Sequence, residues 1–144
     1  MFNRILVLCV GNICRSPTAE YVLKQHLKKQ GITVSSAGLA ALHGEPVNES
    51  AKKVALEYGI DMSTHIAQQV NSKMIYENEV ILVMQQGHLE DLYARYPEVR
   101  GKAFLLGKWI DNAEISDPYR KSDEAFIHVY NLIERSCHAW LKYL

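Results

Sequence analysis

Cys9 and Arg15 are separated by five residues near the start of the chain, and Ser16 follows directly. A cysteine thiolate is a strong nucleophile. The planar guanidinium of an arginine binds two phosphate oxygens at once and follows them as charge shifts in the transition state. The hydroxyl of Ser16 can donate a hydrogen bond to the Cys9 sulfur when the sulfur departs. These residue types at this spacing predict phosphoryl transfer through a phosphocysteine.

The residues between Cys9 and Arg15 suit a loop that binds an oxyanion. Gly11 permits tight curvature or a positive φ, and Asn12 tolerates a left-handed conformation. We expect Ser16 to cap a helix whose first residue is Pro17. N–H groups at a helix start bind phosphate oxygens and stabilise a thiolate. The predicted phosphate-binding residues of this loop are Val10, Gly11, Asn12, Ile13, Cys14 and Ser16.

Such a loop must stand between a buried strand and a helix. Residues 4–9 form an apolar run typical of a central strand. Further strands are predicted at residues 33–37, 80–84 and 103–106, and helices at 17–30, 51–58, 89–96 and 126–141. This alternation predicts an α/β fold: one three-layer domain over residues 1–144, with a four-stranded parallel sheet, helices on both faces and the phosphate loop after the first strand. Ligands of such sheets bind beyond the carboxyl ends of the strands.

Composition limits the other possibilities. The 16 basic and 16 acidic residues balance, so no nucleic-acid partner is expected. The apolar run at the N-terminus is too short for a signal peptide, and no stretch is long enough to insert into a membrane. The 3 cysteines do not form the framework of a secreted scaffold, which favours the reducing cytoplasm.

Together with Asp117-Pro118-Tyr119, the loop resembles the low-molecular-weight protein tyrosine phosphatase family, and the resemblance covers nearly the whole chain. It implies that Asp117 is the general acid of the first step and the general base of the second. It also implies that Tyr119 stacks on the substrate ring and that Ile13 and Leu42 wall the pocket. An ordinary packing role for Leu42 stays open. No metal and no cofactor are expected.

The same resemblance implies a hydrogen-bonded network that supports the loop. Its members here are Asn12, Ser36 and His65, and Gln68 stands where the family often has arginine. In relatives, the cysteine equivalent to Cys14 can form a reversible disulfide with the nucleophile, but the spacing alone does not establish this pairing here. By contrast, Cys137 falls on the apolar face of the last predicted helix, and we expect it in the core.

The segment from Asp117 to Ser122 resembles a bacterial branch that acts with tyrosine autokinases controlling capsule or exopolysaccharide export. The implied partner is a phosphotyrosine protein, in particular an autokinase with a tyrosine-rich tail. Arg120 and Lys121 would attract an acidic tail, although surface charges of this kind are commonly just solvated and have no binding role.

Four other functions compete with this interpretation. An arsenate reductase needs additional cysteines after the loop, and only Cys137 is available. In protein-arginine phosphatases, threonine is typical at the position of Ile13. A phosphotyrosine-binding module without turnover could dispense with Cys9 or Asp117. For a phosphocysteine carrier of a sugar-transport system, Arg15 is not expected.

Overall fold

The computed structural model describes residues 2–144 and contains one parallel sheet with the strand order β2-β1-β3-β4. The strands are β1 (Arg4–Cys9), β2 (Thr33–Gly38), β3 (Val80–Val83) and β4 (Ala103–Leu105). The chain passes from β1 to β2 on one side and then to β3 on the other, and β1 pairs with both. The carboxyl end of β1 is therefore the switch point of the sheet, where ligands bind in folds of this kind. The predicted four-stranded parallel sheet is confirmed.

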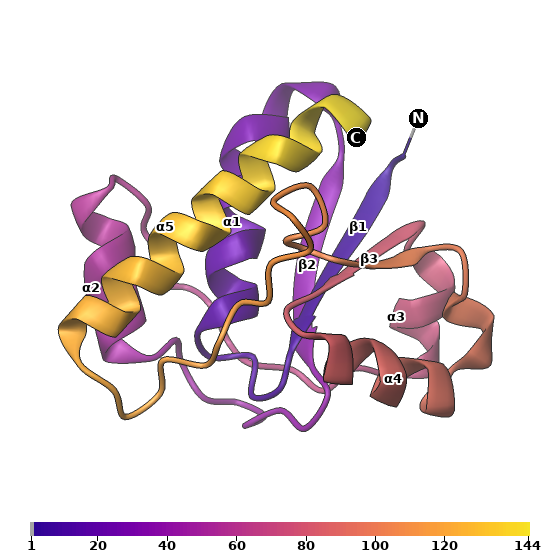
Figure 1. The fold of residues 1–144 in the computed structure, drawn as a ribbon, viewed down its shortest axis with the longest axis horizontal. Helices are drawn as coiled ribbons and strands as arrows, with labels where there is room; N and C mark the ends of the chain where they lie inside the picture. The colour runs from indigo at the N-terminus through magenta and orange to yellow at the C-terminus, as the bar shows by residue number, and fades with distance from the viewer. Residues whose placement is uncertain (1) are drawn as a thin grey trace.

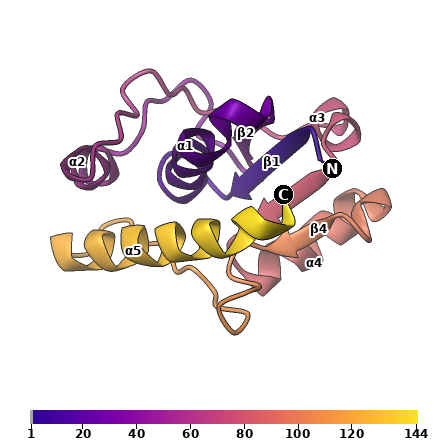
Figure 2. The ribbon, with the colours of Figure 1, turned by 90° about the horizontal axis from the view of Figure 1, so that it is seen from above.

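Helices cover both faces of the sheet (Figures 1 and 2). One face carries α1 (Arg15–Leu27) and α5 (Asp123–Trp140), with α2 (Glu49–Glu57) beside them, and the other carries α3 (Ser72–Glu77) and α4 (Gln86–Arg95). Successive side chains of β1 alternate between the two cores. Ile5 and Val7 pack in the core of α1 and α5, whereas Leu6 and Leu8 pack in the other. This two-sided burial explains why the sequence of β1 is continuously apolar.

The start of α1 differs from the prediction. The helix begins at Arg15, with Cys14 at the cap position and no side-chain cap, so Ser16 and Pro17 lie inside its first turn. The expectation that Ser16 caps this helix is wrong, because its hydroxyl faces inward, 2.9 Å from the sulfur of Cys9. At the other end, a short 3-10 turn separates α1 from Gly31, which has a φ of 69°.

The other predicted helices are present, with starts two or three residues earlier than expected. Side-chain caps explain two of these starts, since Asn48 caps α2 and Ser122 caps α5. The helix α3 was not predicted, because it is short and buries only Ile75. Cys137 is fully buried on α5, as expected. Between residues 2 and 144, no helix combines the length and the apolar character that a membrane crossing requires.

Candidate active site

A cavity of about 190 Å³ opens at the carboxyl end of β1. The predicted nucleophile Cys9, the predicted phosphate ligand Arg15 and the predicted acid Asp117 all line it. The other lining residues are Val10, Gly11, Ile13, Cys14, Ala40, Leu42 and Tyr119. Of the residues predicted to bind phosphate or wall the pocket, Asn12 and Ser16 do not line it; both are fully buried behind it.

The loop that follows β1 is held from outside through its carbonyl groups. The carbonyls of Cys9, Val10 and Gly11 accept from the N–H groups of Leu39, Ala40 and Leu42, at 2.8, 3.0 and 3.0 Å. Two further loop carbonyls accept in the same way: that of Ile13 from Asn48, and that of Cys14 from Thr18. By contrast, no hydrogen bond found between residues 2 and 144 outside the regular helices and strands uses an N–H of residues 10–14 as donor. These N–H groups are left for an oxyanion, which is the arrangement of a phosphate-binding nest.

Asn12 gives the loop its bend and joins it to the protein interior. Its φ is 59°, as expected of a left-handed residue, whereas Gly11 does not have a positive φ. The predicted positive φ therefore falls on Asn12 alone. The backbone N–H of Gln68 donates to Asn12 Oδ1 at 3.0 Å, which orients the side-chain amide. Asn12 Nδ2 then donates to Ser16 Oγ at 2.8 Å and to Ser36 Oγ at 3.0 Å.

This orientation decides where the proton of Ser16 points. Ser16 Oγ already accepts from Asn12, so its own proton is free to be donated. Two acceptors are near: the sulfur of Cys9 at 2.9 Å, and the carbonyl oxygen of Ala37 at 3.5 Å. A thiolate can only accept, so Ser16 donates to the Cys9 sulfur whenever that sulfur is ionised, and this bond stabilises the negative charge.

His65 supports the loop from the backbone side. Its Nε2 lies 2.7 Å from the carbonyl oxygen of Asn12, and a carbonyl only accepts, so Nε2 is the protonated nitrogen. The amide of Gln68 donates to the carbonyl oxygen of Ser36 at 2.9 Å. The three residues thus lie together, as the resemblance implied: Asn12, Ser36 and His65. Gln68, at the position where the family often has arginine, contacts Asn12 and Ser36.

Arg15 is almost fully buried, and one of its terminal nitrogens is occupied by the protein. Nη1 donates to Gln85 Oε1 at 2.8 Å and to the carbonyl oxygen of Ile115 at 2.9 Å. Nη2 lies 4.0 Å from Asp117 Oδ2. The neutral amide of Gln85 holds the guanidinium without cancelling its charge. The remaining donors of the guanidinium can therefore serve an oxyanion in the cavity.

The segment with Asp117 contributes Asp117 and Tyr119 to the lining of the cavity. It follows Ile115, whose N–H donates to the carbonyl oxygen of Met84 at the end of β3 (2.9 Å). Asp117 Oδ1 accepts from the N–H of Tyr119 at 3.0 Å, which leaves Oδ2 toward Arg15. The side chain of Asp117 is 53% exposed, so it can exchange protons with water. A half-exposed Tyr119 stands beside it.

Apolar side chains form the walls of the cavity. Ile13, Leu42 and Ala40 line it together with the ring of Tyr119. Leu42 is 50% exposed, which favours the predicted wall position over ordinary packing in the core. Walls of this kind suit a flat apolar group such as a phenyl ring, because they remove its faces from water.

All three cysteines are free thiols, and they differ in environment. Burial raises the pKa of Cys14 well above the ordinary value, and the neighbouring Cys9 and Asp117 raise it further, against a lowering by Arg15. Cys14 therefore stays protonated at neutral pH. The reversible disulfide that the resemblance implies between Cys9 and Cys14 is not formed in this structure.

Several residues of the site were missed by sequence reasoning. Gln85 and the carbonyl of Ile115 hold Arg15, and Glu20 accepts from Ser36 Oγ at 2.5 Å. Ala40 was missed as a wall. Glu20 gave one signal that could have found it, because an acidic residue between apolar positions of a core helix needs a partner. Gln85 gave a weaker signal, as a polar residue at the end of an apolar strand.

Comparison with known proteins agrees with this geometry. The family described as "Low molecular weight phosphotyrosine protein phosphatase" matches residues 4–144. The low-molecular-weight protein-tyrosine-phosphatase Wzb of Escherichia coli K12 is 46% identical over 144 residues, which cover 100% of this chain and 97% of Wzb.

Solved structures give the same result. Vibrio vulnificus Wzb in complex with benzylphosphonate superposes with a TM-score of 0.95 at 48% identity, covering 100% of both chains. The YwlE arginine phosphatase of Geobacillus stearothermophilus is more distant, with a TM-score of 0.89 and 31% identity over 98% of this chain and 92% of YwlE.

Proposed function

Because the chain belongs to the low-molecular-weight phosphotyrosine protein phosphatase family, we propose that it hydrolyses phosphotyrosine in proteins through a phosphocysteine formed at Cys9. The observation that carries this proposal is the placement of Cys9 in one cavity with Arg15, Asp117 and the loop N–H groups, which donate to no acceptor within residues 2–144. Nucleophile, oxyanion ligands and acid are the parts that this reaction needs.

In the first step, the Cys9 thiolate attacks phosphorus and a sulfur–phosphorus bond forms while the bond to the tyrosyl oxygen breaks. Asp117 gives its proton to that leaving oxygen. The loop N–H groups and Arg15 bind the other phosphoryl oxygens and stabilise the charge that spreads over them in the transition state. The first product is the dephosphorylated tyrosine side chain.

In the second step, water attacks the phosphorus of the phosphocysteine. The Asp117 carboxylate takes a proton from this water, and the sulfur–phosphorus bond breaks. Ser16 donates a hydrogen bond to the departing sulfur, which leaves as a thiolate. Inorganic phosphate is the second product, and the protonation state of the starting enzyme is restored.

The walls of the cavity favour phosphotyrosine over other phosphorylated side chains. Ile13 and Leu42 remove an aromatic ring from water, and Tyr119 offers a ring to stack on it. Phosphoarginine would place a charged guanidinium between these apolar side chains, at a cost in desolvation. Wzb of V. vulnificus was solved with benzylphosphonate, which carries such a ring.

The substrate in the cell is proposed as a tyrosine autokinase with a tyrosine-rich tail that controls exopolysaccharide or capsule production, and the enzyme is proposed to act in the cytoplasm. Support comes from the segment after Asp117, which resembles the branch with such partners, and from the exposed Arg120 and Lys121 next to Tyr119. Cations at this rim would attract an acidic, multiply phosphorylated tail.

The central test uses para-nitrophenyl phosphate without added metal. We expect turnover by the wild type, loss of turnover in Cys9→Ser, and a phosphate adduct on Cys9 in acid-quenched protein. Cys137→Ser is the matched control, since this buried thiol lies outside the cavity. Normal turnover by Cys9→Ser would refute the mechanism. Substrate trapping with Cys9→Ser or Asp117→Ala, followed by identification of retained phosphotyrosine peptides, tests the autokinase partner.

A further inference from the structure

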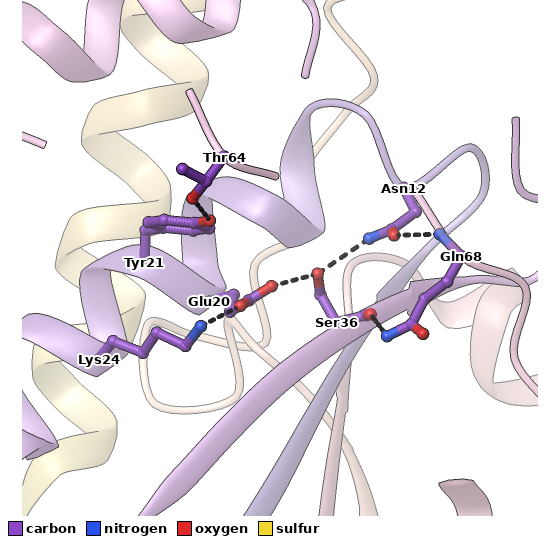
Figure 3. Close-up of polar contacts among 7 residues, drawn as sticks. All are labelled: Asn12, Glu20, Tyr21, Lys24, Ser36, Thr64 and Gln68. Carbon is purple, nitrogen blue, oxygen red and sulfur yellow. Dashed lines mark hydrogen bonds and ion pairs between the residues drawn. The ribbon is translucent and has the colours of Figure 1, made fainter. Parts of the chain in front are cut away.

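A chain of polar contacts runs from the surface of α1 to the underside of the loop, and Figure 3 shows it. Lys24 Nζ lies 2.5 Å from Glu20 Oε2, and Ser36 Oγ donates to Glu20 Oε1 at 2.5 Å. Ser36 Oγ in turn accepts from Asn12 Nδ2 at 3.0 Å. Lys24 is the member of this chain that is open to solvent, with 47% of its side chain exposed against 10% for the mostly buried Glu20. A surface ammonium is thus connected to the residue that bends the loop.

The hydrogen bonds along this chain have fixed directions. An ionised carboxylate only accepts, so Ser36 must give its proton to Glu20. Ser36 Oγ then presents lone pairs to Asn12, and the second proton of Asn12 Nδ2 goes to Ser16 Oγ. Ser16 is left to donate to the Cys9 sulfur. Glu20 thus takes the Ser36 proton and leaves the Ser36 oxygen to accept from Asn12, the residue that also donates to Ser16.

A buried carboxylate needs compensation, since removing a charge from water costs several kcal/mol. The two oxygens of Glu20 have different partners: Ser36 on Oε1 and Lys24 on Oε2. Among residues 2–144, Lys24 is the only cation within 4 Å of this carboxylate. Loss of the ammonium would leave a mostly buried charge uncompensated. The carboxylate would then be drawn toward water and away from Ser36.

A second route connects Lys24 with the loop. Its ammonium lies 5.0 Å from the ring centroid of Tyr21, a cation–π contact. The hydroxyl of Tyr21 is 3.2 Å from Thr64 Oγ1. The rings of Tyr21 and His65 pack edge to face, with their centroids 6.5 Å apart. His65 donates to the carbonyl oxygen of Asn12. Both routes from Lys24 end at Asn12, one at its side chain and one at its backbone.

From these contacts we infer that Lys24 is a positioning residue of the active site, acting through Glu20 and Ser36 on Asn12 and through them on the donor to the Cys9 sulfur. It touches neither the cavity nor the substrate. The expected effect of Lys24 on turnover rests on the proposed phosphatase function. Its expected effect on the reactivity of the Cys9 thiol does not, because that reactivity is measured without any substrate.

The test compares Lys24→Met, which keeps the length of the side chain but removes its charge, with Lys24→Arg, which keeps the charge. Lys73→Met is the matched control, since Lys73 forms an i,i+4 pair with Glu77 on α3, away from this network. Two quantities are measured: kcat and KM for para-nitrophenyl phosphate, and the rate at which iodoacetamide alkylates Cys9, followed by mass spectrometry.

We expect Lys24→Met to lower both kcat and the alkylation rate about three- to tenfold, with little change in KM. This is the usual size of an effect that is transmitted through a packed network of side chains. Lys24→Arg should retain both within about twofold, and Lys73→Met should match the wild type. Unchanged alkylation and kcat in Lys24→Met would overturn the inference, as would equal losses in Lys73→Met. If the wild type did not hydrolyse para-nitrophenyl phosphate, the proposed function would fail, and the alkylation rates would still decide the role of Lys24.

Discussion

Arg15 Nη2 and Asp117 Oδ2 lie 4.0 Å apart, and both residues line the cavity. The guanidinium is held from behind by Gln85 and by the carbonyl of Ile115, two residues before Asp117. The segment from Ile115 to Asp117 therefore helps to position the Arg15 guanidinium and also carries the carboxyl group of Asp117. This shared anchoring keeps the carboxyl group within reach of a leaving oxygen on a phosphate bound to Arg15.

The role of Asp117 is tested by the basicity of the leaving group. Asp117→Asn keeps the side-chain oxygen that accepts from Tyr119 N–H, but it cannot supply a proton. We expect kcat for a phosphotyrosine peptide to fall by roughly 10²–10⁴-fold, and kcat for para-nitrophenyl phosphate to fall less, because para-nitrophenolate departs without full protonation. Asp111→Asn, at a left-handed position outside the cavity, should leave both rates unchanged. Equal losses for the two substrates would contradict the role of general acid.

Ser16→Ala should slow the breakdown of the phosphocysteine more than its formation. The hydroxyl donates to the departing sulfur, and a hydrogen bond to a charged group contributes about 1.5–3 kcal/mol. We expect kcat to fall about 10- to 100-fold while a burst of para-nitrophenol persists in the first milliseconds of a rapid-mixing experiment. Ser136→Ala removes a fully buried hydroxyl that has no partner among residues 2–144, and it should leave kcat unchanged. Loss of the burst itself would place Ser16 in the first step instead.

The three thiols should differ sharply in reactivity. Burial raises the pKa of Cys14 and of Cys137 well above the usual range, so both remain thiols at pH 8. Only thiolates react at an appreciable rate. Iodoacetamide should therefore modify Cys9 alone in the folded protein and all three cysteines in guanidinium chloride, as peptide mass mapping would show. Modification of Cys14 as fast as that of Cys9 would be inconsistent with this environment.

Stability should depend on His88 between about pH 4 and 6.5. Burial, followed by the charge of Arg15, lowers the pKa of His88 to about 4, whereas an unfolded histidine has a pKa of about 6.5. As the pH falls through this window, the unfolded chain binds a proton that the folded chain does not. Stability from this group is therefore complete above pH 6.5 and declines toward pH 4.

Thermal unfolding checks this expectation. His88→Gln should flatten the decline of Tm between pH 6.5 and 4, because its side chain does not titrate. His128→Gln, on the exposed face of α5, should keep the slope of the wild type. Identical slopes for wild type and His88→Gln would show that His88 titrates normally in the folded protein.

Gly38 should tolerate no side chain. A Cβ at this position would stand 2.4 Å from the carbonyl oxygen of Val10, inside the loop, and 2.9 Å from the Cβ of Ala41. We expect Gly38→Ala to destabilise the protein by about 1–3 kcal/mol in urea unfolding and to reduce kcat, because the loop must move. Gly87→Ala, where the new Cβ meets nothing within 4 Å, should be neutral or stabilising. Wild-type stability in Gly38→Ala would contradict the close packing of β2 against the loop.

The sequence by itself determined the succession of the four strands and of every helix except α3 along the chain, the parallel sheet, and the loop from Cys9 to Arg15. The strands and helices could be predicted because apolar runs and helical spacing are local patterns. The loop could be predicted because its residues are neighbours in the chain, so folding changes the distances between them only slightly. The short helix α3 escaped prediction because a single turn with one buried residue, Ile75, has no periodicity. The start of α1 escaped it because the inward hydrogen bonds of Ser16 prevailed over its tendency to cap a helix.

Only the tertiary structure decided which distant groups complete the site. Gln85 and Ile115 meet Arg15 because β3 lies beside β1 and the segment after β4 returns over the sheet. Glu20 and Lys24 connect with Asn12 through Ser36 because α1 packs across β2. Such contacts arise from the packing of elements far apart in the chain, and no local pattern of residues specifies the angle and distance at which those elements meet.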